Sequence, residues 1–185
     1  MPSLPDDDYR ELLIGCGNRR IKEAWRYDDG QDWKSLTTLD IDPNCGADIE
    51  WDLERFPYPF PDDHFDEIHA YEVLEHCGTQ GDYRFFFRQF EEFWRIMKPA
   101  ARLVGSVPKG EMTWGDPGHR RALSLDTFGR LNQNFYTEKV GTNCPVGDYR
   151  FCYRADFDVF SLPHIENPER LFFIIQAVKP SRISI

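Results

Sequence analysis

An apolar run that ends in two glycines constrains the fold more than any other stretch. Leu12-Leu13-Ile14 is followed by Gly15-Cys16-Gly17, and polar residues that favour a helix come next. This pattern is typical of a buried parallel strand that turns sharply into a helix. Because glycine has no Cβ, Gly15 and Gly17 allow unusual backbone angles and let a ligand approach the main chain. In open α/β sheets such a turn binds nucleotide-like ligands.

An acidic residue follows at the end of the second predicted strand. Residues 35–39 form that strand, and Asp40 comes directly after it, at the position where an acid binds ribose hydroxyls. A dinucleotide site also requires a glycine three residues after Gly17, where the helix packs on the strand. Arg20 occupies that position, so the pattern favours a nucleoside ligand without a pyrophosphate.

The remaining periodicity predicts alternating strands and helices in one domain of 185 residues. The second and third strands are separated only by residues 42–47, so we predict that the usual crossover helix is missing there. Apolar aromatic residues recur every three or four positions in the strongest helix and predict core packing. We expect strands at 10–15, 35–39, 48–51, 66–70, 102–107, 135–142 and 170–178, helices at 19–27, 80–98 and 124–132, a tail at 1–9, a loop at 54–64, and a possible substrate lid at 143–168.

Composition excludes several classes of protein. The net charge of -10 argues against sequence-independent binding to nucleic acid, which needs clustered Lys and Arg. There is no apolar run long enough to span a membrane, and the acidic N-terminus is unlike a signal peptide, so we expect a cytoplasmic protein. The five cysteines and five histidines lack metal-site spacing, so no metal site is expected. Oligomeric state is not indicated.

Several segments together resemble the class I S-adenosylmethionine-dependent methyltransferases, over most of the chain. The most specific match ends in Val73-Leu74-Glu75-His76, after a strand of the kind that these enzymes place fourth. No acid precedes Gly15, and Ala100-Ala101 stands where the family often has two glycines. The matching segments, in the family's order, are residues 12–17, 39–42, 48–53, 57–62, 65–76, 93–99 and 116–120.

The resemblance implies a Rossmann-like, doubly wound α/β fold. Its sheet would have seven mostly parallel strands with a reversed last strand, between helices in a three-layer α/β/α arrangement. It also implies S-adenosyl-L-methionine as the cofactor. The implied cofactor contacts are Gly15, Cys16 and Gly17 at the methionine part, Asp40 and Ile41 around the ribose, Asp52 and Leu53 at the adenine, and Ala70 and Tyr71 at the sulfonium.

The acceptor is expected to be a small molecule or a sugar. His119 lies in the segment 116–120 and is either the general base for a hydroxyl acceptor or a residue that fixes its loop. Arg120 and Arg121 beside it are candidates for an anionic acceptor, and His76 for a helix-terminus hydrogen bond. Two other functions stay open: a non-catalytic, cofactor-binding regulatory subunit and a nicotinamide oxidoreductase.

Overall fold

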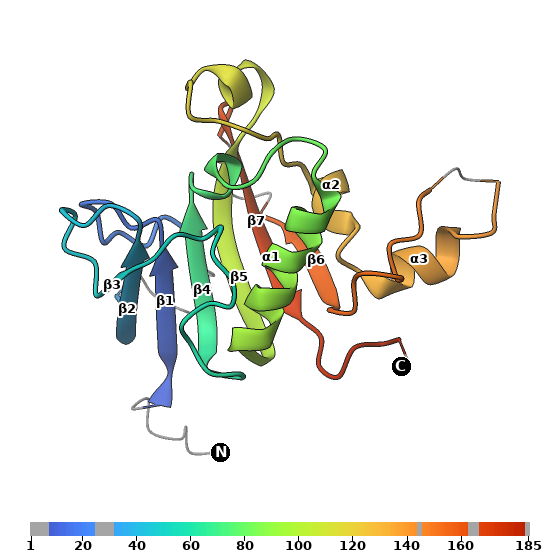
Figure 1. Cartoon of the computed structure of the whole chain (residues 1–185), viewed down its shortest axis with the longest axis horizontal. Coiled ribbons are helices and arrows are strands. Elements are labelled where there is room, and N and C mark those ends of the chain that lie inside the picture. Colours follow the sequence, from blue (N-terminus) through green and yellow to red (C-terminus); the bar gives the residue numbers. More distant parts are fainter. Residues whose placement is uncertain (1–7, 25–31, 144–145, 163–166, 184–185) are drawn as a thin grey trace.

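The computed structural model describes residues 8–24, 32–143, 146–162 and 167–183. Seven strands form one sheet in the order β3-β2-β1-β4-β5-β7-β6 (Figure 1). Within the described residues, β7 pairs antiparallel with both of its neighbours and the other pairs are parallel, which confirms the predicted reversed last strand. The strands are β1 (Arg10–Ile14), β2 (Ser35–Asp40), β3 (Ile49–Glu50), β4 (Phe65–Tyr71), β5 (Met97–Pro108), β6 (Phe157–Ser161) and β7 (Arg170–Ala177).

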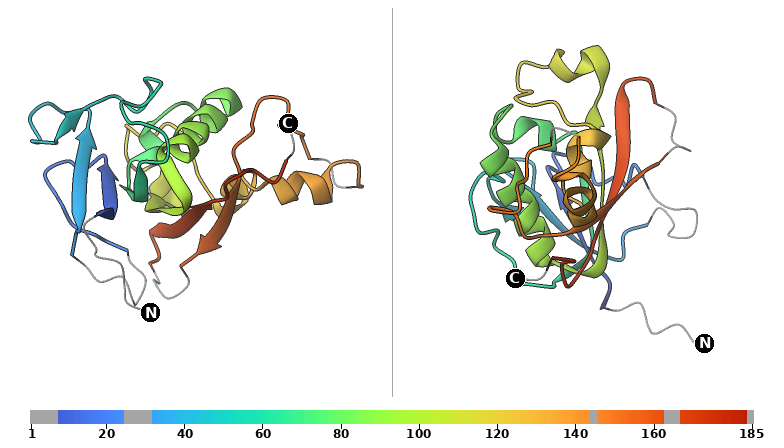
Figure 2. Two further views of the ribbon diagram at one scale, coloured as in Figure 1. Left: turned by 90° about the horizontal axis from the view of Figure 1, so that it is seen from below. Right: turned by 90° about the vertical axis from the view of Figure 1, so that its right-hand side faces the viewer.

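Two helices of the described chain cover one face of this sheet. The longest, α1 (Tyr83–Ile96), begins where Asp82 accepts a hydrogen bond from the Phe85 amide, and it buries its aromatic stripe as predicted. The ring of Phe90 packs against Phe128 of α2 (Leu125–Gly129), so both helices lie on the same face. Figure 2 shows α1 to one side of the sheet in both views. The other helices are α3 (Gln133–Lys139) and the short 3-10 helices η2 (Leu74–His76) and η3 (Gly110–Trp114).

The opposite face carries an irregular segment where we predicted a helix. Residues 19–24 of the predicted helix 19–27 are not helical, so this prediction is wrong there, and residues 25–27 lie outside the described chain. Arg20 donates to the carbonyls of Gly17, Cys45 and Gly46, and the Tyr71 hydroxyl bonds the backbone of Ala24. These tertiary contacts hold the segment along the sheet and override its local helix propensity.

A buried network of charged side chains lies on that same face. Lys22 Nζ is 2.5 Å from Glu11 Oε1, and His69 Nε2 is 2.8 Å from Glu67 Oε1. Arg102 adds a second cation 2.9 Å from Glu67 Oε2. Both buried carboxylates of this network, Glu11 and Glu67, therefore have cationic or imidazole partners, which offset the cost of removal from water. This network explains why the central strand β4 contains a glutamate and a histidine.

The C-terminal third differs most from the prediction. Residues 135–142 are not a strand, because α3 occupies Gln133–Lys139 after Asn132 caps it by accepting from the Asn134 amide. The strand that precedes β7 in the chain is β6, which lies inside the predicted lid 143–168. The crossover helix between β2 and β3 is missing, as predicted, and the loop 54–64 is confirmed. Among the described residues, no helix has the length and apolarity that crossing a bilayer requires.

Acid should weaken the fold through Glu11. Burial alone would raise the pKa of Glu11, but hydrogen bonds from His69 and Lys22 outweigh it and lower the pKa from 4.5 to about 2. The stability that this carboxylate contributes is therefore complete above about pH 4.5 and is lost as the pH falls toward 2. We expect Glu11→Gln to cost about 3 kcal/mol at pH 7, since it leaves Lys22 unpaired, and to flatten the acid dependence.

Urea unfolding between pH 7 and pH 2.5 measures both effects. The matched control is Glu50→Gln, because Glu50 is an exposed carboxylate on the edge strand β3. An acid dependence equally steep in Glu11→Gln and in the wild type would contradict the assignment.

Candidate functional site

A pocket of about 430 Å³ lies at the carboxyl ends of β1, β2, β3 and β4, and we call it the strand-end pocket. Ligands of open α/β sheets bind in this position, outside the carboxyl ends of the strands. Loops after these strands and one residue of the 116–121 loop form its wall. The lining residues are Gly15, Leu39, Asp40, Ile41, Trp51, Asp52, Leu53, Glu54, Glu72, Val73, His76, Cys77 and Arg120.

The turn after β1 brings bare backbone to this pocket. Gly15 has a φ of 61°, and its amide donates to the carbonyl of Leu39 over 2.9 Å. A Cβ on Gly15 would lie 2.4 Å from Cγ2 of Val73, so a larger side chain has no room. The next glycine, Gly17, also has a positive φ of 48° but faces open space. Only the first glycine is therefore required by both backbone angle and packing.

Asp40 presents a fixed carboxylate at the end of β2. Its Oδ2 accepts from the Gly17 amide over 2.7 Å, and its Oδ1 accepts from the Asp42 amide over 2.9 Å. A carboxylate has about four acceptor sites, so capacity remains for hydroxyl donors from a ligand. The two backbone bonds orient the group in advance, which lowers the entropy cost of binding.

Five of the residues predicted to contact the cofactor line this one pocket. They are Gly15, Asp40, Ile41, Asp52 and Leu53. Ile41 keeps 64% of its surface exposed, and the largely buried Leu53 lines the same pocket. Such a pair of apolar surfaces suits the flat ring of a base.

The other four predicted contacts do not line the strand-end pocket. Cys16 packs with Leu13 in a small cluster on the far face of the sheet, and Ala70 is buried in the main core. Tyr71 points to the same far face, where its hydroxyl is 2.8 Å from Nδ1 of His69. Side chains alternate between the two faces of a strand, so the end of β4 aims Tyr71 away from the pocket. Gly17 contributes to the site through its amide, which donates to the carboxylate of Asp40.

Sequence reasoning did not assign several residues that line the pocket after β4. Glu72, Val73 and His76 belong to the segment that resembles the methyltransferases, so a signal was present there. Arg120 arrives from the distant loop, and its guanidinium makes a short ion pair with Glu54 across the pocket wall. The Gly78 amide donates to the same Glu54 carboxylate over 2.8 Å.

A cluster of Glu75, His76 and His119 borders the pocket. His119 itself does not line the pocket, but its ring lies 4.8 Å from that of His76, which does. His119 Nε2 is 3.8 Å from Oε1 of Glu75, and His119 Nδ1 is 2.9 Å from the carbonyl of Thr113. Burial raises the pKa of Glu75 to about 7, and the charge of Glu72 acts in the same direction. The cluster therefore combines an ionisable carboxyl with two imidazoles.

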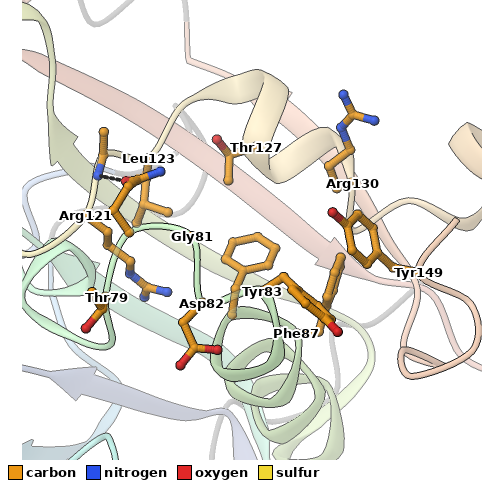
Figure 3. Close-up of a pocket in the computed structure, with 13 residues that line it drawn as sticks. Thr79, Gly81, Asp82, Tyr83, Phe87, Arg121, Leu123, Thr127, Arg130 and Tyr149 are labelled. Atoms are coloured by element: carbon orange, nitrogen blue, oxygen red, sulfur yellow. Dashed lines mark hydrogen bonds between the residues drawn. The ribbon is translucent and has the colours of Figure 1, made fainter. Parts of the chain in front are cut away.

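A second pocket of about 240 Å³ lies at the N-terminal end of α1, and we call it the aromatic pocket. Figure 3 shows Arg121 at one side of it and Arg130 with Tyr149 at the other. Arg121 is buried, donates to the Leu74 carbonyl over 2.8 Å, and also contacts Gln89. The lining residues are Thr79, Gln80, Gly81, Asp82, Tyr83, Phe86, Phe87, Arg121, Ala122, Leu123, Thr127, Arg130 and Tyr149.

Of these two pockets, the described part of the predicted lid contributes to the aromatic pocket. Tyr149 is the one described residue of 143–168 that lines it, and no described residue of that segment lines the strand-end pocket. The ring of Tyr149 packs on Tyr83 and Phe87 of α1. Residues 144–145 and 163–166 of the predicted lid lie outside the described chain.

Comparison with known proteins shows what the fold is. No family model and no curated protein sequence matches the chain. Among solved structures, a SAM dependent methyltransferase from Archaeoglobus fulgidus is 14% identical, with a TM-score of 0.53 over 91% of this chain and 86% of that one. The CurJ carbon methyltransferase is 15% identical, with a TM-score of 0.56 over 95% of this chain, which spans only 50% of CurJ.

A third similar structure was solved with a ligand. The N-methyltransferase NodS from Bradyrhizobium japonicum, in complex with S-adenosyl-L-homocysteine, is 15% identical, with a TM-score of 0.51 over 91% of this chain and 78% of NodS. These identities are low, and the agreement lies in the arrangement of the strands. With its strand order, its single reversed strand and these structural relatives, the chain has the fold of the class I S-adenosylmethionine-dependent methyltransferases.

Proposed function

We propose that the protein is a methyltransferase that binds S-adenosyl-L-methionine in the strand-end pocket and methylates a small molecule. The observation that carries this proposal is the pairing of Gly15 and Asp40 at one pocket wall, on the fold described above. The residues present fit the cofactor. Asp40 offers an oriented acceptor to the ribose hydroxyls, and Ile41 and Leu53 offer apolar surface to the adenine, with Asp52 beside them.

The methionine part and the sulfonium would lie on the other side of this pocket. Gly15 presents its main chain there, with Val73 packed where a Cβ would be, and the Glu72 carboxylate provides negative charge near a cationic sulfonium. We propose that Cys16, Gly17, Ala70 and Tyr71 act through their backbone, because their side chains do not line the pocket.

The methyl donor supplies its own reactivity, so the protein has mainly to position the two reactants. Holding an acceptor atom in line with the sulfur–carbon bond is worth up to roughly 7–11 kcal/mol of barrier. A hydroxyl acceptor would also need to lose a proton, and His119 stays the predicted base. The support for this role is its cluster with His76, which reaches the pocket wall.

The aromatic pocket is the candidate acceptor site. It adjoins the strand-end pocket through Arg120, whose guanidinium donates to Thr79 of the aromatic pocket over 3.3 Å. Its rings and the cations Arg121 and Arg130 suit a small acceptor with an apolar or aromatic part and an anionic group. In this proposal Tyr149 is the residue of the predicted lid that covers the acceptor, from the side of α1.

Removal of Asp40 should abolish most of the affinity for the cofactor. We expect Asp40→Ala to weaken binding of S-adenosyl-L-homocysteine about 100-fold, since two hydrogen bonds to a charged acceptor are worth about 3 kcal/mol. Isothermal titration calorimetry measures it. Asp42→Ala is the matched control, because Asp42 is exposed and does not line the pocket. Equal affinities of the two variants would count against the ribose contact.

The two glycines of the turn should respond differently to alanine. Gly15→Ala combines a positive φ with a clash against Val73, so we expect a loss of about 3 kcal/mol of stability and of cofactor binding. Gly17→Ala meets no atom within 4 Å and should cost about 1 kcal/mol. Thermal unfolding and calorimetry with S-adenosyl-L-homocysteine measure both. Similar effects of the two substitutions would refute the packing argument.

Methyl transfer itself is tested with a radiolabelled methyl donor and a fractionated cell extract. We expect label in the small-molecule fraction, and Thr127→Trp should abolish it by filling the aromatic pocket while leaving cofactor affinity intact. Asp126→Trp is the control, an exposed neighbour on α2 that does not line the pocket.

Three outcomes are informative. Label only in protein or nucleic acid would reject a small acceptor. Cofactor binding without transfer to any fraction would favour a regulatory subunit. Binding of NADH without binding of S-adenosyl-L-methionine would favour an oxidoreductase.

A further inference from the structure

Two histidines and a glutamate meet at the border of the strand-end pocket in an arrangement that methyl-donor binding does not use. One ligand atom from each of Glu75, His76 and His119 lies within 4.8 Å of the others. We propose that these three residues bind a divalent transition-metal cation, in which case His119 is a ligand and not the base considered above. Two imidazoles and one carboxylate are a frequent ligand set for such ions, and three protein ligands leave positions open to a further molecule.

The hydrogen bonds of both imidazoles prepare them for this role. His119 Nδ1 is 2.9 Å from the Thr113 carbonyl, and His76 Nδ1 is 3.1 Å from the Gly118 carbonyl. A carbonyl oxygen only accepts, so each Nδ1 carries the hydrogen, and in a neutral ring Nε2 then has the free lone pair. Metal-binding histidines have this second bond to a carbonyl or carboxylate, which fixes the ring and its tautomer.

Glu75 supplies a carboxyl group that accepts no hydrogen bond in the described chain. The residue is fully buried, and neither of its carboxyl oxygens has a hydrogen-bond partner within the described chain. An unpaired buried carboxylate is costly, and a bound cation would remove that cost. Oε1 instead faces Nε2 of His119 at 3.8 Å, which is too long for a hydrogen bond. Ligand atoms around one metal lie roughly 3 Å apart, so these atoms, which lie within 4.8 Å of one another, would move closer together on binding.

Two carboxylates and two guanidinium groups surround this position. Glu72 lies near Glu75, and its Oε1 is buried without a hydrogen-bond partner in the described residues. Arg121 and Arg170 also act on Glu75 and would compete with a cation: Nη1 of Arg121 is buried without a partner in the described residues, whereas Arg170 pairs with Glu23 at 2.7 Å and with Glu72 at 3.7 Å. Because His76 lines the strand-end pocket, the open metal positions would face that pocket.

Two other clusters of metal-binding residue types are less suitable. Glu11, Glu67 and His69 are already neutralised by Lys22 and Arg102. In the group of Cys16, Asp40 and Cys45, both oxygens of Asp40 accept from backbone amides, and burial raises the pKa of Cys16 to about 11. Neither cluster offers an unpaired anion, so each serves as an internal control.

The experiment is a metal titration of the full chain. After treatment with a chelator, the wild type is titrated with Co²⁺, followed by visible absorption, and then with Zn²⁺ by calorimetry, without cofactor. We expect one equivalent of each ion to bind. His76→Asn, His119→Asn and Glu75→Gln should each weaken binding by more than about 100-fold, since each removes a direct ligand. His64→Gln and Cys45→Ser should bind as the wild type does.

The outcomes separate clearly. No binding of Co²⁺ or Zn²⁺ by the wild type would overturn the proposal, as would ligand variants that bind normally or loss of binding in Cys45→Ser. Thermal unfolding shows which variants fold, and the exposed His76 keeps the test valid if Glu75→Gln does not. Calorimetry with S-adenosyl-L-homocysteine on the same variants shows separately whether the cofactor proposal holds.

Discussion

The whole site depends on the hydrogen bonds that join the turn after β1 to the end of β2. The Gly15 amide donates to the Leu39 carbonyl, and the Gly17 amide donates to the carboxylate of Asp40. One strand end thereby fixes the shape of the loop on its neighbour, and the loop in turn orients the acid. A pocket wall built from backbone groups of two parallel strands needs no helix to hold it, which is consistent with the irregular chain that follows.

The second face of the sheet uses polar anchors where a helix was expected. Arg20 satisfies three backbone carbonyls, and Lys22 places its ammonium group beside Glu11. An extended segment covers more sheet per residue than a helix does, but it needs partners for its polar groups. The charged network on β1 and β4 provides such partners, so the network and the missing helix have the same structural cause.

Much of the architecture was predictable because its signals are local. Strand periodicity, the glycines of the first turn and Asp40 each depend on a few adjacent residues, and the short link before β3 follows from its length. The segment 135–142 was misassigned because its aromatic residues suit a strand, whereas the cap at Asn132 decides for a helix. Residues 19–24 could not be predicted because their conformation is set by contacts with distant strands.

The site was predictable only where it follows directly from a strand end. The direction of the Tyr71 side chain depends on the residue at which β4 ends. A sequence pattern locates the end of a strand only to within one or two residues. The meeting of Glu75 with His119 is non-local. It follows from the loop that returns along η2, where the amides of Arg120 and Arg121 donate to the Glu75 carbonyl. The spacing of residues along the chain therefore could not predict that contact.

The ion pair between Glu54 and Arg120 has a consequence for the entry of a ligand into the strand-end pocket. The two side chains are 35% and 47% exposed, and pairs in water at this level of exposure contribute only about 0–1 kcal/mol. A pair this weak opens readily, and rising ionic strength weakens it further, so it is only a small barrier at the pocket wall.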